Sequence, residues 1–107
     1  MPWYLYLAHF FGGAFLANAV PHLVNGISGR PFPSPFASPP GQGDSSPVIN
    51  VAWSAVNAGI AYLLLFQAGR FTFDSRGDTL VAGIGAFLMS LMLAKGFGRV
   101  YAGRTKR

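Results

Sequence analysis

Two short series of polar side chains interrupt an otherwise apolar sequence, and they are the residues best suited to do chemistry. They are Asn18, His22 and Asn25, followed by Asn50, Ser54 and Asn57. In both series the spacing of four and then three residues places the side chains on one face of a helix. Trp53 lies beside the second series. Because amides, a hydroxyl and an imidazole all form hydrogen bonds, the pattern predicts contacts between helices or a small binding site.

Three arrangements of these polar side chains remain open. They can hydrogen-bond directly between two helices, they can line a polar pocket, or a helix from another protein can complete the cluster. A pocket would be formed beneath the connection between the helices by Asn18, His22, Asn50 and Asn57. An unpaired amide is costly near the middle of an apolar stretch, where Asn57 lies. We therefore expect Asn57 to point toward the first helix, within hydrogen-bonding reach of Asn18 or of a backbone carbonyl near Ala14.

Other reactive groups are few, since the chain has two His, three acidic residues and no Cys. The acids lie at or near helix ends, so neither a carboxylate proton relay nor a catalytic pair is expected. His9 lies about 180° around the first helix from Asn18, and we expect it to pair with a carbonyl oxygen. His9 and His22 are too far apart on one helix to hold one haem, although an oligomer could supply two copies of either. No enzymatic activity, metal or cofactor is therefore expected.

Three long apolar stretches must position these side chains. They run from Trp3 to about Leu23, from Val48 to about Ala68 and from about Leu80 to Phe97. Each approaches the roughly 20 residues that a helix needs to cross a hydrocarbon core of about 30 Å. Only 10% of the residues are charged, against about 25% in an average soluble domain. The sequence predicts a single all-α membrane domain, residues 1–107, with three transmembrane helices at about residues 3–24, 47–68 and 79–98.

The connection at about residues 27–46 is rich in proline and glycine. Its prolines alternate with other residues from Pro31 to Pro35, which predicts an extended, polyproline-like path. Two interpretations are open: a stiff linker with its Phe rings at the membrane surface, or a loop folded over the helix ends as a lid or docking surface. The candidate docking residues are Arg30, Phe32 and Phe36.

Capping signals mark the ends of the predicted helices. Ser46 is expected to cap the second helix, with Pro47 at its first position. Asn25-Gly26 is expected to cap the end of the first helix. A second connection, at about residues 69–78, is predicted to be a turn in which Asp78 caps the third helix. Residues 99–107 are expected to form a basic tail.

The distribution of Lys and Arg predicts the orientation of the chain, whose net charge is +5. With three crossings, the C-terminus and the first connection lie on the same side. That side carries Arg30, Lys95, Arg99, Arg104, Lys106 and Arg107, and the other side carries Arg70 and Arg76. The positive-inside rule therefore places the N-terminus outside, and the C-terminus and the Pro/Gly-rich loop in the cytoplasm. The tail lacks the interleaved aromatic residues that stack bases, so no nucleic acid is expected as a partner.

In pattern, the stretch GAFLANAVPHLVNGISGRPFPSPFASPPGQGDSSPVINVAWSAVN resembles small bacterial integral-membrane proteins of unassigned function. The resemblance implies a bacterial origin, and hence a multi-pass protein of the inner membrane, but no mechanism or site. From the residues themselves we expect a non-enzymatic protein that acts by association, as an accessory subunit or a homo-oligomer. The alternative is binding or transport of a small molecule or ion through the polar pocket. The expected partners are the lipid bilayer and another membrane protein or a second copy.

Overall fold

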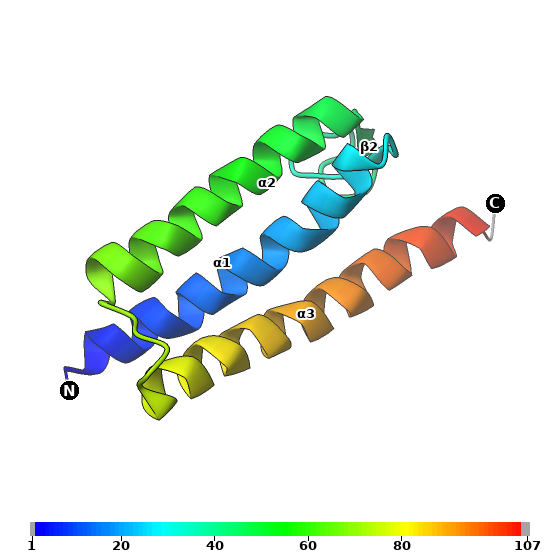
Figure 1. Cartoon of the computed structure of the whole chain (residues 1–107). Helices are drawn as coiled ribbons and strands as arrows, with labels where there is room; N and C mark the ends of the chain where they lie inside the picture. The colour runs from blue at the N-terminus through cyan, green and yellow to red at the C-terminus, as the bar shows by residue number, and fades with distance from the viewer. Residues whose placement is uncertain (1, 106–107) are drawn as a thin grey trace.

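The computed structural model describes residues 2–105 and consists mainly of three long helices (Figure 1). Its elements, in chain order, are α1 (Trp3–Ile27), β1 (Phe32–Pro33), β2 (Asp44–Ser45), α2 (Pro47–Tyr62), the π-helical segment η1 (Leu63–Ala68) and α3 (Arg76–Thr105). The helices α1, α2 with η1, and α3 are each long and apolar enough to cross a membrane. This confirms the prediction of an all-α chain with three candidate membrane spans.

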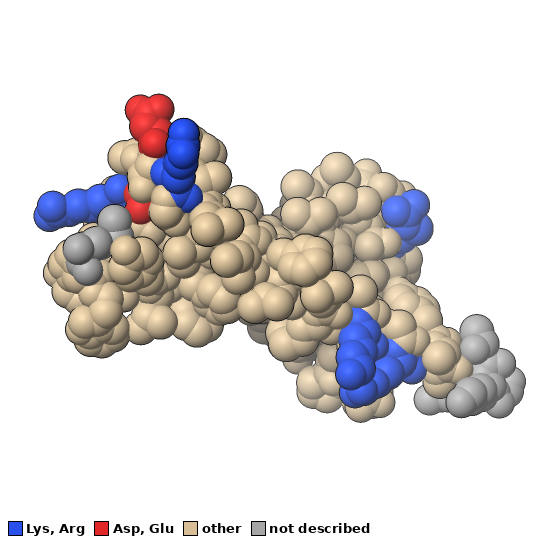
Figure 2. Space-filling view, turned by 90° about the horizontal axis from the view of Figure 1, so that it is seen from below, with Lys and Arg blue, Asp and Glu red and all other residues tan. Residues whose placement is uncertain are grey.

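The helix α1 lies between α2 and α3 and packs against both, whereas α2 and α3 make little direct contact (Figure 1). In the most apolar part of each helix, 39% of the residues of α1 are buried, against 6% of those of α3. Charged side chains gather at the two ends of the molecule, and the surface between them is uncharged (Figure 2). The shape and the charge distribution are therefore those expected of a chain that lies across a hydrocarbon layer.

The helix α1 continues past Pro21 and past the predicted end near residue 24. Its stop is not Asn25-Gly26 but Gly29, whose φ of 73° suits glycine. The backbone amide of Gly29 donates to the Gly26 carbonyl (3.1 Å), and that of Arg30 donates to the Asn25 carbonyl (2.9 Å). This pair of bonds is the Schellman motif, which satisfies carbonyls that a helix end otherwise leaves free. The predicted cap was therefore a few residues too early.

The start of α2 agrees with its capping signal, because the Ser46 side chain accepts a hydrogen bond from the Ile49 amide (3.2 Å) and Pro47 is at the first turn. Its end differs from a regular helix, since residues 63–68 widen into the π-helical η1. The amides of Gly69 and Phe71 then bond back to the carbonyls of Leu64 and Leu65. Nothing in the sequence indicated this widening.

The helix α3 begins at Arg76 and is longer than predicted at both ends. Ser75, not Asp78, supplies its cap, because the Asp78 backbone amide donates to Ser75 Oγ (3.1 Å). The Asp78 carboxylate is therefore not used as the helix cap, and the residue is buried, with only 4% of its surface exposed. Residues 99–105, expected to be a tail, continue the helix. Lys106 and Arg107 lie outside the described residues.

The Pro-rich connection folds back over the helix ends as a small hairpin, which we call the hairpin (residues 28–46). Its strands β1 and β2 pair antiparallel, with Phe32 opposite Ser45 and Pro33 opposite Asp44. Phe32, Pro33 and Ser34 are all buried. In the structure, the connection therefore has the folded-back arrangement, with Phe32 buried and Phe36 exposed.

Glycines allow the backbones of α1 and α3 to touch near the end opposite the hairpin. A Cβ atom on Gly13 would lie 2.0 Å from the Ala82 carbonyl oxygen, and one on Gly85 would lie 2.0 Å from the Phe10 carbonyl oxygen. Real side chains cannot approach backbone so closely, so both positions require glycine. Close approach of this kind is a main source of helix association in lipid.

The substitution Gly85→Ala is expected to destabilise the fold by about 1–3 kcal/mol, because the new methyl group forces two backbones apart. Its matched control is Gly83→Ala on the same helix, where nothing lies within 4 Å of the added Cβ. That control is expected to be neutral or to stabilise by up to about 1 kcal/mol through helix propensity. Unfolding of both variants by SDS in mixed micelles would compare them, and equal stabilities would contradict the close-contact account.

Candidate functional site

The side chain of Asn50, in the first turns of α2, joins three parts of the molecule. It is 0% exposed. Its Nδ2 donates to three backbone carbonyl oxygens, those of Phe32 (3.0 Å), Ser46 (3.1 Å) and Ser45 (3.2 Å). Its Oδ1 lies 2.7 Å from Nδ1 of His22 on α1. One amide therefore holds the hairpin, α1 and α2 together.

The bonds of Asn50 also decide which nitrogen of His22 carries a proton. Three carbonyl oxygens surround one terminal atom of the Asn50 amide, and carbonyls can only accept, so that atom is nitrogen. The other terminal atom is then the oxygen, which can only accept from His22. The Nδ1 atom of His22 must therefore carry hydrogen and donate to it, which leaves Nε2 on the opposite side of the ring.

A second amide pair joins α1 to α2 deeper in the helices. Asn18 Nδ2 donates to Asn57 Oδ1 (2.8 Å), and Asn57 Nδ2 donates to the Trp53 carbonyl one turn earlier (2.9 Å). Asn57 is 0% exposed. Of the two partners predicted for Asn57, the structure has Asn18, and the costly amide has partners at both ends.

The remaining predicted polar residues do not join the contact between the helices. Ser54 is buried, but its hydroxyl donates to the Val51 carbonyl of its own helix (2.6 Å). Asn25 donates to the Pro21 carbonyl (2.8 Å) and accepts from Arg30 Nε (3.1 Å). Among the described residues of the two stripes, the pairs Asn18–Asn57 and His22–Asn50 join α1 to α2, so the stripes meet at two points and not along their whole length.

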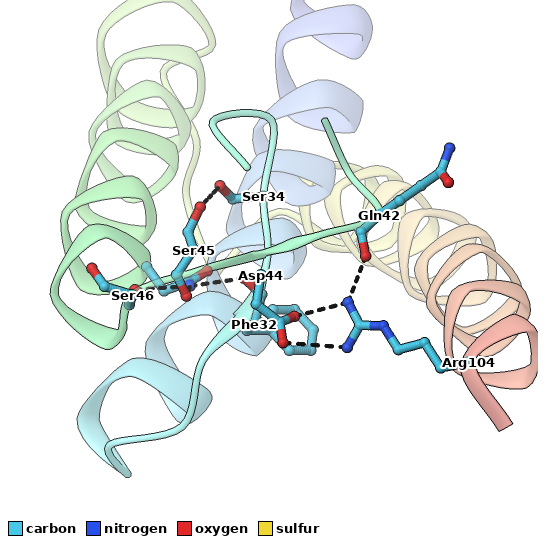
Figure 3. A network of polar contacts seen from close by, with 8 residues as sticks. Phe32, Ser34, Gln42, Asp44, Ser45, Ser46 and Arg104 are labelled. Carbon is cyan, nitrogen blue, oxygen red and sulfur yellow. Dashed lines mark hydrogen bonds and ion pairs between the residues drawn. The ribbon is translucent and has the colours of Figure 1, made fainter. Parts of the chain in front are cut away.

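The hairpin forms a roof over His22. The Phe32 ring packs against the rings of His22 and Phe97, with centroids 5.4 and 4.6 Å apart. The hydroxyls of Ser34 and Ser45 share a hydrogen bond across the hairpin (Figure 3). Together with the bonds to Asn50, these contacts fix the roof relative to α1, α2 and α3.

Arg104, near the end of α3, ties that helix to the hairpin. Its guanidinium donates two hydrogen bonds to the Asp44 carboxylate, at 3.0 and 3.3 Å, and a third to the Gln42 carbonyl oxygen (Figure 3). Both side chains are about one-third exposed, so the pair contributes at most about 1 kcal/mol. Its bidentate geometry nevertheless fixes where the hairpin lies against α3. No pattern in the sequence indicated this contact.

The three candidate docking residues have different environments. Phe32 is 7% exposed and is held inside the molecule, so it is not available to a partner. Phe36 is 64% exposed and packs edge-on against Trp53 of α2, with centroids 5.1 Å apart. Arg30 is exposed beside the end of α1. The prediction of a docking loop made of all three residues is therefore wrong for Phe32, since that ring forms the core of the roof.

A small open cavity, which we call the roof cavity, lies beneath the hairpin and has a volume of about 190 Å³. It is lined by Asn18, His22, Pro33, Ser34, Pro35, Gly41, Trp53 and Phe97. Of the four residues predicted to form a polar pocket, Asn18 and His22 line it. Asn50 and Asn57 do not, because their amides are used in direct bonds between the helices.

A second polar cluster lies at the other end of the molecule, where α1 meets the connection to α3. His9 Nε2 donates to the Gly69 carbonyl oxygen (2.6 Å), the kind of partner predicted for this histidine. Its Nδ1 lies 3.5 Å from Asp78 Oδ1, and the other carboxylate oxygen accepts from the Thr72 amide (3.2 Å). The contact of Asp78 with His9 was not predicted from the sequence, although a carboxylate in the first turn of an apolar helix was a possible signal. Within residues 2–105, no group of three or more His, Cys, Asp or Glu side chains could hold a metal ion.

Comparisons with known proteins bring no further information about this site. No family model, curated protein or solved structure matches the chain.

The substitution Asn57→Leu is expected to lower the free energy of unfolding by about 1 kcal/mol, because Asn18 loses its partner and the larger side chain crowds α1. The matched control is Val56→Leu on the same helix, since Val56 is 49% exposed. Reversible unfolding in mixed micelles would measure both variants. An Asn57→Leu protein as stable as the parent would show that the pair with Asn18 contributes nothing to the fold.

Proposed function

We propose that this chain is a non-enzymatic integral membrane protein that acts by association, binding a transmembrane helix of a partner subunit or of a second copy. The reactive side chains support this role, because most of them form hydrogen bonds or ion pairs that stabilise the fold. His9 and Asp78 hold the connection between η1 and α3, Asp44 holds Arg104, and His22 binds Asn50.

The observation that carries the proposal is an open groove between α1 and α3, which we call the α3 groove. It has a volume of about 610 Å³ and is almost entirely apolar. Its lining residues are Leu16, Ala17, Val20, Pro21, Val24 and Asn25 on α1, and Ala86, Ser90, Leu93, Ala94 and Phe97 on α3. The backbones of the two helices touch at Gly13 and Gly85, which do not line this groove.

Small residues on α3 make the groove suitable for another helix. Ala86, Ser90 and Ala94 follow one another at four-residue spacing, so they form one stripe. Such a stripe lets a second backbone approach closely, which is how helices associate in lipid, where the hydrophobic effect offers no driving force between them. Ser90 and Ala94 are exposed in the single chain. The partner surface is therefore a helix with its own small residues or a ridge of aliphatic side chains.

The same proposal includes the location and orientation of the chain. The resemblance of residues 13–57 to small bacterial membrane proteins supports a bacterial inner membrane. The excess of Lys and Arg on the side of the hairpin and the C-terminus supports a cytoplasmic position for both, with the N-terminus outside. Under this orientation, the bond between Arg104 and Asp44 closes the cytoplasmic end of the molecule.

Association through the α3 groove predicts that Ala94→Leu abolishes the complex, because the added side chain fills the space that a partner backbone needs. Extraction into nanodiscs followed by native mass measurement would give the mass of the parent assembly, and so distinguish a homo-oligomer from a complex with another subunit. The matched control is Ala55→Leu on α2, where the alanine is exposed and lies outside the α3 groove.

Each result of that experiment bears on the proposal. A parent protein that is monomeric without a co-purifying partner would contradict association altogether. Loss of the complex in Ala55→Leu but not in Ala94→Leu would place the interface on α2 and contradict the α3 groove.

The orientation can be tested by single-cysteine labelling, which is clean because the chain has no Cys. Asp74→Cys, on the connection between η1 and α3, is expected to react with a membrane-impermeant maleimide in intact bacterial cells whose outer membrane is permeabilised. Gln42→Cys, in the hairpin, is expected to react only after the inner membrane is broken. The opposite pattern would place the hairpin outside.

A further inference from the structure

The roof cavity contains a hydrogen-bond acceptor that the fold does not use. His22 is 3% exposed, and its Nδ1 donates to Asn50. Since Nδ1 faces Asn50, the opposite edge of the ring, with Nε2, is the edge left for the cavity that His22 lines. No hydrogen bond to Nε2 occurs among the described residues. Nε2 is not among the buried atoms that lack a partner, so it is accessible, and a donor group of a ligand can reach it.

The charge state of that acceptor follows from its surroundings. The ion pairs of the described residues join His9 to Asp78 and Arg104 to Asp44, and neither involves His22. No side chain that lines the cavity is charged, within the part of the chain that the structure describes. The His22 ring with hydrogen on Nδ1 therefore presents a lone pair at Nε2, and the complementary ligand group is a neutral O–H or N–H donor.

The walls of the cavity define the rest of the ligand. Trp53 and Phe97 contribute aromatic rings, Pro33 and Pro35 contribute apolar rings, and Asn18 adds an amide beside His22. The volume of about 190 Å³ slightly exceeds the roughly 150 Å³ of a cavity known to hold benzene. An aromatic ring packs favourably edge-on or offset against such walls.

We propose that the roof cavity binds a neutral hydroxylated aromatic ring, whose hydroxyl donates to His22 Nε2 and whose ring packs against Trp53 and Phe97. An organic cation is a poorer fit because no carboxylate lines the cavity. An anion is a poorer fit because no Lys or Arg lines it and His22 offers a lone pair. Two sources share this chemistry: a free phenol, and the head group of a membrane quinol whose tail lies in the bilayer.

Binding can be measured through Trp53, which is one of only two tryptophans in the chain. The other, Trp3, is 72% exposed at the start of α1, so Trp3→Phe leaves a single reporter in the cavity wall. The probe is 4-methylphenol, added to the protein in nanodiscs, with empty nanodiscs to correct for partitioning. Its control is 4-methylanisole, which has the same ring but no hydroxyl hydrogen. We expect saturable quenching of Trp53 by 4-methylphenol and about tenfold weaker binding of 4-methylanisole.

The role of Nε2 is tested by His22→Asn in the same background. An asparagine amide reaches the position of Nδ1, so it keeps a donor for Asn50 but has no atom at the position of Nε2. We expect about tenfold weaker binding of 4-methylphenol, the effect of losing one hydrogen bond. The matched control, His9→Gln, replaces the other histidine at the far end of the molecule and is expected to leave the affinity unchanged.

A second measurement needs no variant and covers the case in which His22→Asn fails to fold. In protein labelled with ¹⁵N at its two histidines, the His22 Nε2 resonance is expected to shift when 4-methylphenol is added, while the His9 resonances stay in place. Absence of both this shift and saturable quenching would overturn the proposal. Equal binding of 4-methylphenol and 4-methylanisole would also overturn it, because the hydroxyl would then have no role.

The source of the ligand is distinguished by competition with decylhydroquinone, which has the same hydroxylated ring on an apolar tail. Displacement of 4-methylphenol by decylhydroquinone supports a membrane quinol. Binding of 4-methylphenol without such displacement supports a free phenol, since the cavity then excludes a substituted ring. Either outcome retains the hydroxylated ring as the ligand.

Discussion

The arrangement of α1, α2 and the hairpin depends on the hydrogen bonds of one buried amide, that of Asn50. Its nitrogen binds three backbone carbonyls of the hairpin and of the start of α2, and its oxygen binds His22 of α1. In apolar surroundings each of these groups would be costly without a partner. Because Asn50 satisfies them together, the position of the hairpin, the approach of α1 to α2 and the tautomer of His22 are set by the same side chain.

The two interfaces of α1 use different physical interactions. Toward α2, the contact is polar and directional, with the pairs Asn18–Asn57 and His22–Asn50 fixing the register of the helices. Toward α3, the contact near Gly13 and Gly85 depends on backbone approach and dispersion. Directional polar pairs form in only one register of the two helices, whereas a smooth surface of small residues can pack against different helices. The helix α3 also has low burial in the single chain and an open groove beside it.

The roof cavity is a consequence of how the polar groups share their bonds. Asn50 and Asn57 use their amides within the bundle, but His22 and Asn18 each have atoms left over at the edge of the same cluster. The hairpin covers these atoms with Phe32, Pro33 and Ser34 and leaves a space between them. The hydrogen bonds that hold the walls of the cavity in place are made by Asn50 and Asn57, whereas a ligand would use His22 Nε2. The cavity can therefore keep its shape without a ligand.

The sequence by itself determined the three apolar helices, the cap at Ser46 and the contact between Asn57 and Asn18. These follow from rules that act locally or along one helix: the length of an apolar run, the donors of a first turn, and the cost of an amide in hydrocarbon. Only the tertiary structure decided that Phe32 lies inside, that Asp78 faces His9 and that Arg104 binds Asp44. In each case the side chain contacts a residue that is distant in the sequence, and this contact sets its orientation. No local sequence pattern specifies which distant residue that will be.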